Sequence, residues 1–338
     1  MSITIKDVAR VAGVSKATVS RVLNGSENVS KATKNRVLKV IEELNYQPNF
    51  MARGLVKQKS YSIAIIVPDI RNPFFAQMCW KAERTMSQYG YSAVICSTNN
   101  QTSEEEVYLR NMKERRVDGV LIASAIGDAT NIIDFKVREG IKVLLFDVDV
   151  RGYEIPTVIV DDIYGGHKMT KYLIELGHRR IAFATSNVTY AERQRLLGYK
   201  MALSDVGFPI NEDMIIVNDE SNWNSGRCDD LVLLMRSEQR PTAIFCSNDL
   251  KAFRACEILR NNGVEVPTHV SIAGYDNLEL GEIMSPPLTT MAQPIDQMVE
   301  SGISMLIAEL NGEKIERPKK KYRPMLVERE SCKPLTIL

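Results

Sequence analysis

The pattern of hydrophobic and polar positions changes near residue 60. Before that point, apolar residues recur at helical spacing. After it, short continuous apolar runs rich in valine and isoleucine alternate with amphipathic segments of helical length. Such runs are typical of parallel strands covered on both faces. Nine runs lie at residues 62–69, 91–99, 117–124, 142–149, 157–162, 179–186, 214–219, 242–249 and 270–277.

This pattern predicts the fold class. The N-terminal part is all-α, and the body that follows is α/β with two doubly wound parallel-sheet lobes, because nine strands suit two sheets better than one. Most of the runs end in Asp, Asn or Ser. The ligand crevice of an open parallel sheet lies outside the carboxyl ends of its strands, so these residues suit a polar, hydroxyl-rich ligand. For most of them, opening a turn or capping a helix is the simpler explanation.

The first 46 residues are predicted to form three short helices. Thr4 is placed to cap the first, and Gly13 follows it where a sharp turn needs positive φ. Ser15 and Ser30 are placed to cap the second and third. Two short helices joined through a glycine are typical of a helix-turn-helix, whose second helix fits the major groove of DNA. The apolar positions expected to face inward are Ile5, Val8, Ala9, Ala12, Val19, Val22, Leu23, Val37, Val40, Ile41 and Leu44.

The charge distribution favours a nucleic-acid partner for this head. Residues 1–60 hold eleven Lys and Arg against four Asp and Glu, a balance of +7, whereas the remaining 278 residues carry −6. A basic head on an acidic body indicates that the head meets a polyanion. On charge alone, a solvated surface helix explains the pattern equally well.

Three exposed positions of the second helix are candidates for contact with base edges. Arg21 can bond guanine, Lys16 can bond guanine or a phosphate, and Ala17 can offer apolar contact to a thymine methyl group. Other side chains of the head are short and polar, which suits them to phosphates. They are Ser15, Thr18, Ser20, Asn24, Ser30 and Thr33.

The segment N-F-M-A-R-G-L at 49–55 follows the head and is predicted to be a conditional helix. Asn49 is a plausible cap after Pro48. About two turns are too short to be stable alone in water, and Gly54 costs about 1 kcal/mol more. We therefore expect helix here only against a partner. A passive linker with chance apolar residues is the alternative.

Several functional classes receive no support from the sequence. No apolar run approaches the roughly 18 residues of a membrane helix, and the N-terminus does not resemble a secretory signal. Six scattered cysteines without a C-x-x-C pair indicate reduced, mostly buried thiols of a cytoplasmic protein. The three histidines lie far apart in the sequence, so no metal site is expected. Nucleotide-binding, zinc-protease and hydrolase motifs are absent, so neither an enzyme nor a cofactor is expected.

The stretch T-I-K-D-V-A-R-V-A-G-V-S-K-A-T-V-S-R-V-L-N, residues 4–24, resembles the head of the LacI/GalR family of bacterial transcription regulators. The body is similar to further signature stretches of that family, at 68–76, 115–120, 161–166, 176–182, 247–249, 274–277 and 287–294. The resemblance implies the fold of periplasmic sugar-binding proteins. It also implies a helix-turn-helix domain at 1–46, a hinge helix or linker at 47–60, and an effector-binding and dimerisation domain at 61–338. The N-lobe would span about 61–161 and 292–322, and the C-lobe about 162–290 and 323–333.

The resemblance identifies the partner of the conditional helix. Residues 49–55 match the family's hinge helix, which enters the minor groove as a pair in a dimer. Leu55 matches the leucine that pries apart a base step and bends the duplex, and Ala52 matches its small neighbour. Gly54 departs from the family, which more commonly has a side chain there. This departure suggests a costlier hinge and a more conditional grip on DNA.

The resemblance also implies an effector site in the body. Asp147, Arg195, Asn248 and Asp276 match the family's effector contacts, and such groups can bond the hydroxyls of a sugar. Arg195 would accept a sugar, a sugar acid or a sugar phosphate equally. Three aromatic side chains match the residues that wall the family's pocket, namely Phe74, Phe75 and Trp223. Packing in the core explains aromatic residues at these positions equally well. Arg254 departs from the family, where a glycine is common.

The expected function is therefore a sequence-specific DNA-binding regulator, of the repressor type, for carbohydrate-metabolism genes. A small sugar-like effector bound between the lobes would control it allosterically. Its partners would be a second copy of the chain, in a homodimer, and double-stranded DNA with a pseudo-palindromic operator. One alternative is a regulator triggered by a protein corepressor. A remote alternative is a sugar-metabolising enzyme with a DNA-binding head.

Overall fold

The structure, a computed structural model, describes residues 3–23, 28–46, 59–123, 130–150, 152–186 and 189–335. Two compact units make up the chain, Met1–Ser60 and Tyr61–Leu338. Three of the predicted DNA contacts, Asn24, Ala52 and Leu55, lie outside the described residues, as does the predicted hinge helix at 49–55.

The head consists of the helices α1 (Ile5–Ala12), α2 (Lys16–Leu23) and α3 (Lys31–Glu43). Thr4 is the N-cap of α1, and its N–H and its hydroxyl both donate to Asp7 Oδ2, at 3.0 and 2.7 Å. Gly13 has a φ of 62°, which confirms the predicted turn. Val8, Val19 and Val37, one from each helix, are fully buried together and form the centre of the head's core.

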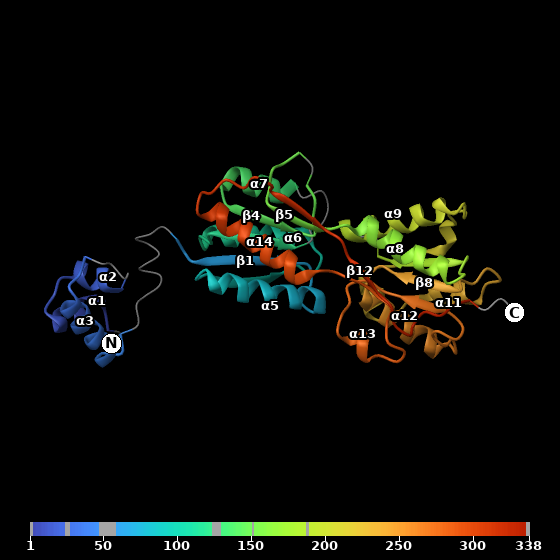
Figure 1. The fold of residues 1–338 in the computed structure, drawn as a ribbon, viewed down its shortest axis with the longest axis horizontal. Helices are drawn as coiled ribbons and strands as arrows, with labels where there is room; N and C mark the ends of the chain where they lie inside the picture. The colour runs from blue at the N-terminus through green and yellow to red at the C-terminus, as the bar shows by residue number, and fades with distance from the viewer. Residues whose placement is uncertain are drawn as a thin grey trace. The chain divides into compact units, whose positions relative to one another are not determined.

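The first lobe of the body is the N-lobe, which contains the helices α5, α6, α7 and α14 in Figure 1. It is built on a six-stranded parallel sheet with the order β11-β5-β4-β3-β1-β2. Successive side chains of a strand point to opposite faces. On one face of the sheet Ile63 and Ile65 pack with α5 and α14, and on the other face Ala64 and Ile66 pack with α6 and α7. Because both faces are covered, the predicted run at 62–69 is apolar along the whole strand. The elements are β1 (Ser62–Val67), α5 (Pro73–Gln88), β2 (Ser92–Ser97), α6 (Thr102–Glu114), β3 (Gly119–Ala123), α7 (Thr130–Glu139), β4 (Lys142–Phe146), β5 (Thr157–Val160), α14 (Ile295–Leu310) and β11 (Lys319–Tyr322).

The second lobe, the C-lobe, is built on a four-stranded parallel sheet with the order β7-β6-β8-β9. Phe183 and Phe245 pack with α8 and α9 on one face, and Ala182 and Ile244 pack with α11 and α12 on the other. The elements are α8 (Asp162–Glu175), β6 (Ile181–Thr185), α9 (Tyr190–Asp205), a 3-10 turn (Glu212–Met214), β7 (Ile215–Val217), α10 (Glu220–Asn224), α11 (Asp229–Arg236), β8 (Ala243–Cys246), α12 (Asp249–Asn261), β9 (Ser271–Ala273) and α13 (Leu280–Ile283).

The chain passes between the lobes three times: after β5, after β10 (Thr290–Ala292) and between β11 and β12 (Met325–Val327). β10 and β12 pair antiparallel with each other. Each of the nine predicted runs contains a strand, and the predicted fold class of the body is confirmed. β10, β11 and β12 were not predicted. β10 and β12 have only three residues each, and β11, K-K-K-Y, is an exposed edge strand without an apolar pattern.

Candidate functional site

The head presents the predicted base-contacting residues on the outer face of α2. Lys16, Ala17 and Arg21 are exposed, whereas Val19 and Val22 on the opposite face are buried. The helix is thereby anchored by its apolar side, and its polar side is accessible to a partner.

The predicted phosphate contacts of the head include two pairs that also begin helices. The Ser15 hydroxyl accepts a hydrogen bond from the Thr18 N–H at 3.1 Å, and Ser30 accepts one from the Thr33 N–H at 3.3 Å. In both pairs the two hydroxyl oxygens lie 2.9 Å apart. Helix N-termini favour anions, so the starts of α2 and α3 suit phosphate groups. Ser20 is half-buried on α2.

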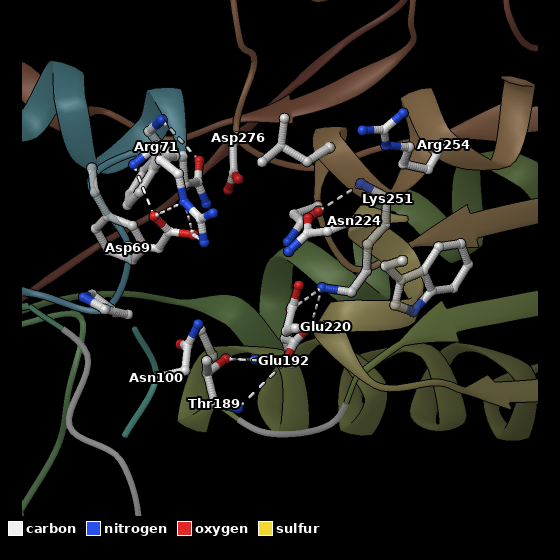
Figure 2. A pocket seen from close by; sticks show the side chains of 18 of the residues that line it. Asp69, Arg71, Asn100, Thr189, Glu192, Glu220, Asn224, Lys251, Arg254 and Asp276 are labelled. Carbon is white, nitrogen blue, oxygen red and sulfur yellow. Dashed lines mark hydrogen bonds and ion pairs between the residues drawn. The ribbon is translucent and has the colours of Figure 1, made fainter. Parts of the chain in front are cut away.

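The body contains a cavity of about 530 Å³ that residues of both lobes line (Figure 2). The size is typical of small-molecule sites. All seven predicted effector residues line it: Phe74 and Phe75 at the start of α5, Asp147 after β4, Arg195 on α9, Trp223 on α10, Asn248 before α12 and Asp276 after β9.

Arg195 lies in a network that occupies its guanidinium on several sides. Its Nε donates to Asp162 Oδ1 at 2.8 Å, and its Nη1 donates to the Ser247 carbonyl oxygen at 2.7 Å. Its Nη1 also lies 3.6 Å from Asp276 Oδ1, and the guanidinium carbon lies 3.7 Å from the centre of the Tyr275 ring. Burial would lower the pKa of Arg195, but Asp162 and Asp276 raise it, so the side chain stays charged.

Two glycines let α8 and α9 approach closely enough to place Arg195. A Cβ on Gly166 would lie 2.2 Å from the Arg195 carbonyl oxygen, and a Cβ on Gly198 would lie 2.2 Å from the Ile163 carbonyl oxygen. Real side chains do not tolerate such distances. Both positions therefore need glycine for the backbones to touch.

Two aspartates of the cavity have unusual backbone conformations. Asp147 has a φ of 59° and Asp276 a φ of 118°, both in the region that L side chains rarely adopt. Such strain is often found at functional sites. Burial raises the pKa of Asp276 to about 6, against the opposing effect of Arg195, and burial together with Asp162 raises the pKa of Asp147 well above its usual range. Asp276 also accepts a hydrogen bond from Gln293 Nε2 at 2.7 Å.

The predicted aromatic residues contribute unequally to the cavity surface. Phe74 and Trp223 are 3% and 1% exposed, and most of each ring packs in a lobe core. The Trp223 indole N–H donates to the Thr185 carbonyl oxygen at 3.3 Å. Phe75 is half-buried and meets Phe74 edge to face, with ring centres 5.2 Å apart. Of the three, Phe75 offers the most ring surface to a ligand.

The C-lobe wall of the cavity contains a buried ionic cluster that was not predicted from the sequence. Lys251 Nζ lies 3.0 Å from Glu192 Oε1 and 2.5 Å from Glu220 Oε1. The Ser186 hydroxyl lies 2.9 Å from Glu192 Oε2, and the Ser247 hydroxyl donates to Glu192 Oε1 at 2.8 Å. The side chains of Lys251 and Glu192 are 2% and 4% exposed, whereas that of Glu220 is 34% exposed.

The charges of this cluster stabilise one another. Burial would raise the pKa of Glu192, but Lys251 and the hydrogen bonds from Ser247 and Ser186 lower it to about 2. Burial would lower the pKa of Lys251, but Glu192 and Glu220 raise it. Lys251 and Glu192 are therefore both ionised at neutral pH.

Two further ion pairs lie at the cavity, one on each lobe, and Figure 2 shows the one between Arg71 and Asp69. On the N-lobe, Arg71 forms a bidentate pair with Asp69, with Nε–Oδ1 and Nη2–Oδ2 distances of 2.9 Å. On the C-lobe, Arg254 Nη1 donates to Glu257 Oε2 at 2.7 Å. Arg254, the departure noted in the sequence, is therefore a cavity residue.

The part of the chain that the structure describes has neither a membrane-spanning helix nor a metal-binding cluster. No helix there is long and apolar enough to cross a membrane. In the same residues, no group of three or more His, Cys, Asp and Glu side chains could hold a metal ion. The six cysteines are all unpaired and buried, as predicted.

Comparison with protein families assigns both units. The model of the bacterial regulatory proteins of the lacI family matches residues 4–49, and the model of the periplasmic binding protein-like domain matches residues 170–332. The chain is 35% identical over 338 residues to the HTH-type transcriptional regulator DegA of Bacillus subtilis (strain 168), covering 99% of each protein.

Solved structures with both units are also similar. The transcriptional regulator CelR, in complex with cellobiose, has a TM-score of 0.73 and 30% identity, over 98% of this chain and 100% of that chain. The Lac repressor dimer, bound to operator and the anti-inducer ONPF, has a TM-score of 0.86 and 26% identity, over 98% of this chain and 99% of that chain.

Proposed function

Because this chain belongs to the lacI family of bacterial regulatory proteins, we propose that it represses carbohydrate-metabolism genes by binding specific operator DNA. A small sugar-like effector bound in the cavity of the body would control that binding. The observation that carries the proposal is the arrangement of α2, whose exposed face holds Lys16, Ala17 and Arg21 while its apolar face is fixed in the core of the head.

The cavity supports control by a small molecule. It brings carboxylate, guanidinium and amide groups together from segments that are far apart in the sequence, as in Asp147, Arg195, Asn248 and Asp276. These groups suit the hydroxyls of a sugar. Since both lobes line the cavity, a ligand that touches both would favour one relative arrangement of the lobes.

The proposal includes a homodimer and a hinge. A pseudo-palindromic operator presents two half-sites related by two-fold symmetry, so reading it takes two heads. In such a dimer, residues 49–55 would become helical in the minor groove, with Leu55 and Ala52 at the wedged base step. The effector would act by changing the spacing of the two heads, and would be bound without turnover. Nothing in the described part of the chain favours a protein corepressor or an enzyme over this proposal.

The test is selection of bound molecules from random duplex DNA by the full-length protein at two salt concentrations. We expect enrichment of a pseudo-palindrome with a pyrimidine–purine step at its centre, where the duplex is easily kinked. Sedimentation of the protein with that duplex should give two chains per duplex. Binding that weakens with salt but enriches no sequence would reduce the head to an electrostatic anchor and contradict the proposal.

A further inference from the structure

The cationic side chains at the cavity are all paired with carboxylates of the protein itself. Four cations occur among the described residues that line it, namely Arg71, Arg195, Lys251 and Arg254. Their partners are Asp69 for Arg71, Asp162 and Asp276 for Arg195, Glu192 and Glu220 for Lys251, and Glu257 for Arg254. An anionic ligand would have to compete with these carboxylates for each cation.

The N-termini of the helices that begin at the cavity also interact with groups of the protein itself. Long helices that begin there are α5, α9 and α12, and a helix N-terminus attracts anions. The first turn of α9 contains Glu192, and that of α12 contains Asp249. α5 begins with Pro73, which has no N–H, and the Asn72 side chain accepts the hydrogen bond of the Phe74 N–H. These helix starts therefore do not substitute for a dedicated anion site.

The net charge of the lining points the same way. Six carboxyl groups line the cavity against the four cations, namely Asp69, Asp147, Glu192, Glu220, Glu257 and Asp276. Burial raises the pKa of Asp147 well above its usual range, and with Asp147 neutral the lining still holds five carboxylates against four cations. A ligand that brings a further negative charge into a partly desolvated site would meet repulsion from this excess.

Glu220 is the carboxylate of the buried cluster that remains accessible. Lys251 Nζ and the Ser186 hydroxyl both meet its Oε1, at 2.5 and 2.8 Å, and fix the side chain. Among the described residues, no hydrogen bond reaches its Oε2. With 34% of the side chain exposed, the carboxylate projects into the cavity in Figure 2. An acceptor held in this way suits a hydroxyl donor of a ligand.

We propose that the effector is a polyhydroxylated molecule without negative charge, and that Glu220, held by Lys251, accepts hydrogen bonds from its hydroxyl groups. This inference rests on the proposed function, because it assigns the chemical class of the effector and a residue that reads it. A neutral or amine-bearing sugar fits. Sugar acids and sugar phosphates, which Arg195 alone would accept, are excluded because Arg195 already has its anions.

The test is titration of the full-length protein with a panel of pentoses, hexoses and disaccharides. Each carbohydrate is supplied as the neutral sugar, the uronic acid, the phosphate ester and the amino sugar. Thermal shift identifies the ligands that bind, and calorimetry at pH 7.5 measures each Kd. We expect binding by neutral or amino forms, and at least about 100-fold weaker binding by the matching anions. An anion that binds more tightly than its neutral form would overturn the assignment of charge.

A variant tests the role of Glu220. Glu220→Gln keeps the shape and removes the charge, and since hydrogen bonds to charged groups contribute about 1.5–3 kcal/mol, Kd for the neutral ligand should rise about 10- to 100-fold. Glu212→Gln is the matched control, because Glu212 also pairs with a lysine, Lys200 at 2.8 Å, but does not line the cavity. Its Kd should stay within about threefold of the parent, as expected for an exposed pair. An unchanged Kd for Glu220→Gln would overturn the role of Glu220.

The outcomes also separate this inference from the proposed function. An anionic effector that changes operator affinity would overturn only the inference and leave a ligand-controlled repressor. If no carbohydrate of any charge binds and none of them changes the affinity for the operator, both the inference and the effector part of the proposed function fail. Selection of an operator by the head is measured independently of either result.

Discussion

Replacing Lys251 by methionine should destabilise the C-lobe strongly. The same replacement of a surface lysine that also pairs with a glutamate should have little effect. Lys251 is 2% exposed and compensates the charge of Glu192, which is 4% exposed. Methionine fills most of the volume of the lysine stem and supplies no charge. The variant therefore leaves a buried carboxylate without a cation, which typically costs about 3–5 kcal/mol.

The acidity of Glu192 gives an independent magnitude. Its pKa is lowered from 4.5 to about 2. At about 1.4 kcal/mol for each tenfold change in an acidity constant, this depression corresponds to about 3 kcal/mol at neutral pH. Since the folded pKa lies below the unfolded one, this stability is present above pH 4.5 and is lost as the pH falls towards 2. The cost of an unpaired buried carboxylate and the depression of the Glu192 pKa therefore give similar free energies, of about 3 kcal/mol or slightly more.

Urea unfolding followed by the fluorescence of Trp223 measures the loss of stability in the C-lobe itself. Trp223 is 1% exposed in the same lobe, whereas the chain's other tryptophan, Trp80, is 60% exposed, and Trp80→Phe removes its signal. A loss of 3–5 kcal/mol should lower the urea midpoint by about 1 M or more, given slopes of about 1–3 kcal/mol per M. Lys200→Met is the matched control, and breaking its exposed pair with Glu212 should cost about 1 kcal/mol or less.

The pH dependence provides a sharper criterion. Without Lys251, burial raises the pKa of Glu192 above 4.5, so the penalty is present at neutral pH and is relieved as the pH falls and the carboxyl group protonates. The difference in stability between Lys251→Met and the parent should therefore shrink between pH 7 and pH 5. Adding Glu192→Gln should recover most of the loss. A Lys251→Met variant that loses less than about 1 kcal/mol, or the same amount at both pH values, would refute this reasoning.

Three further predictions concern the head, the cavity and the helix crossing. Arg21→Ala should weaken specific operator binding by about 1–3 kcal/mol and blur one operator position in a selection experiment, whereas an equal loss on random DNA would make Arg21 a phosphate contact. Effector affinity should fall as the pH drops through about 6, where Asp276 protonates and can accept fewer hydroxyl donors, and Asp276→Asn should remove this dependence in calorimetric titrations. Gly198→Ala should lower the free energy of unfolding in urea by about 1–3 kcal/mol and weaken effector binding. The reason is that a Cβ 2.2 Å from the Ile163 carbonyl oxygen pushes apart the helices that place Arg195. Unchanged effector affinity would show that the position of Arg195 does not depend on this helix crossing.

The long-range pattern of the sequence predicted the strands because burial on both faces leaves an unbroken apolar run. β11 gives no such signal. Its Lys319, Lys320 and Lys321 lie at an exposed sheet edge, and pairing with β5 is made by the backbone. Composition does not report on backbone pairing at an edge, so the strand is visible only once the sheet exists.

The cavity was predicted in part, and the missing part has a physical reason. The resemblance supplied Asp147, Arg195, Asn248 and Asp276, and the structure brings these together at one cavity. The Lys251 cluster joins segments that lie far apart in the sequence, and no local pattern relates them. One signal was available: Lys251 occupies the first turn of α12, where a cation opposes the helix dipole, so an unusual partner had to compensate it.

The three passages of the chain between the lobes also constrain how the protein is made. α14 packs on α5, β4 and β5, and β11 closes the edge of the N-lobe sheet, yet both come from the last 44 residues of the chain. The head is complete after residue 46, but the N-lobe sheet is not complete until Tyr322 has been synthesised. At about 5–20 residues per second, roughly 15–55 s separate these events on the ribosome. During that interval the apolar surface that α14 will cover is open, so we expect the nascent N-lobe to expose apolar surface until the end of synthesis, and a frameshift late in the gene to disable the first lobe.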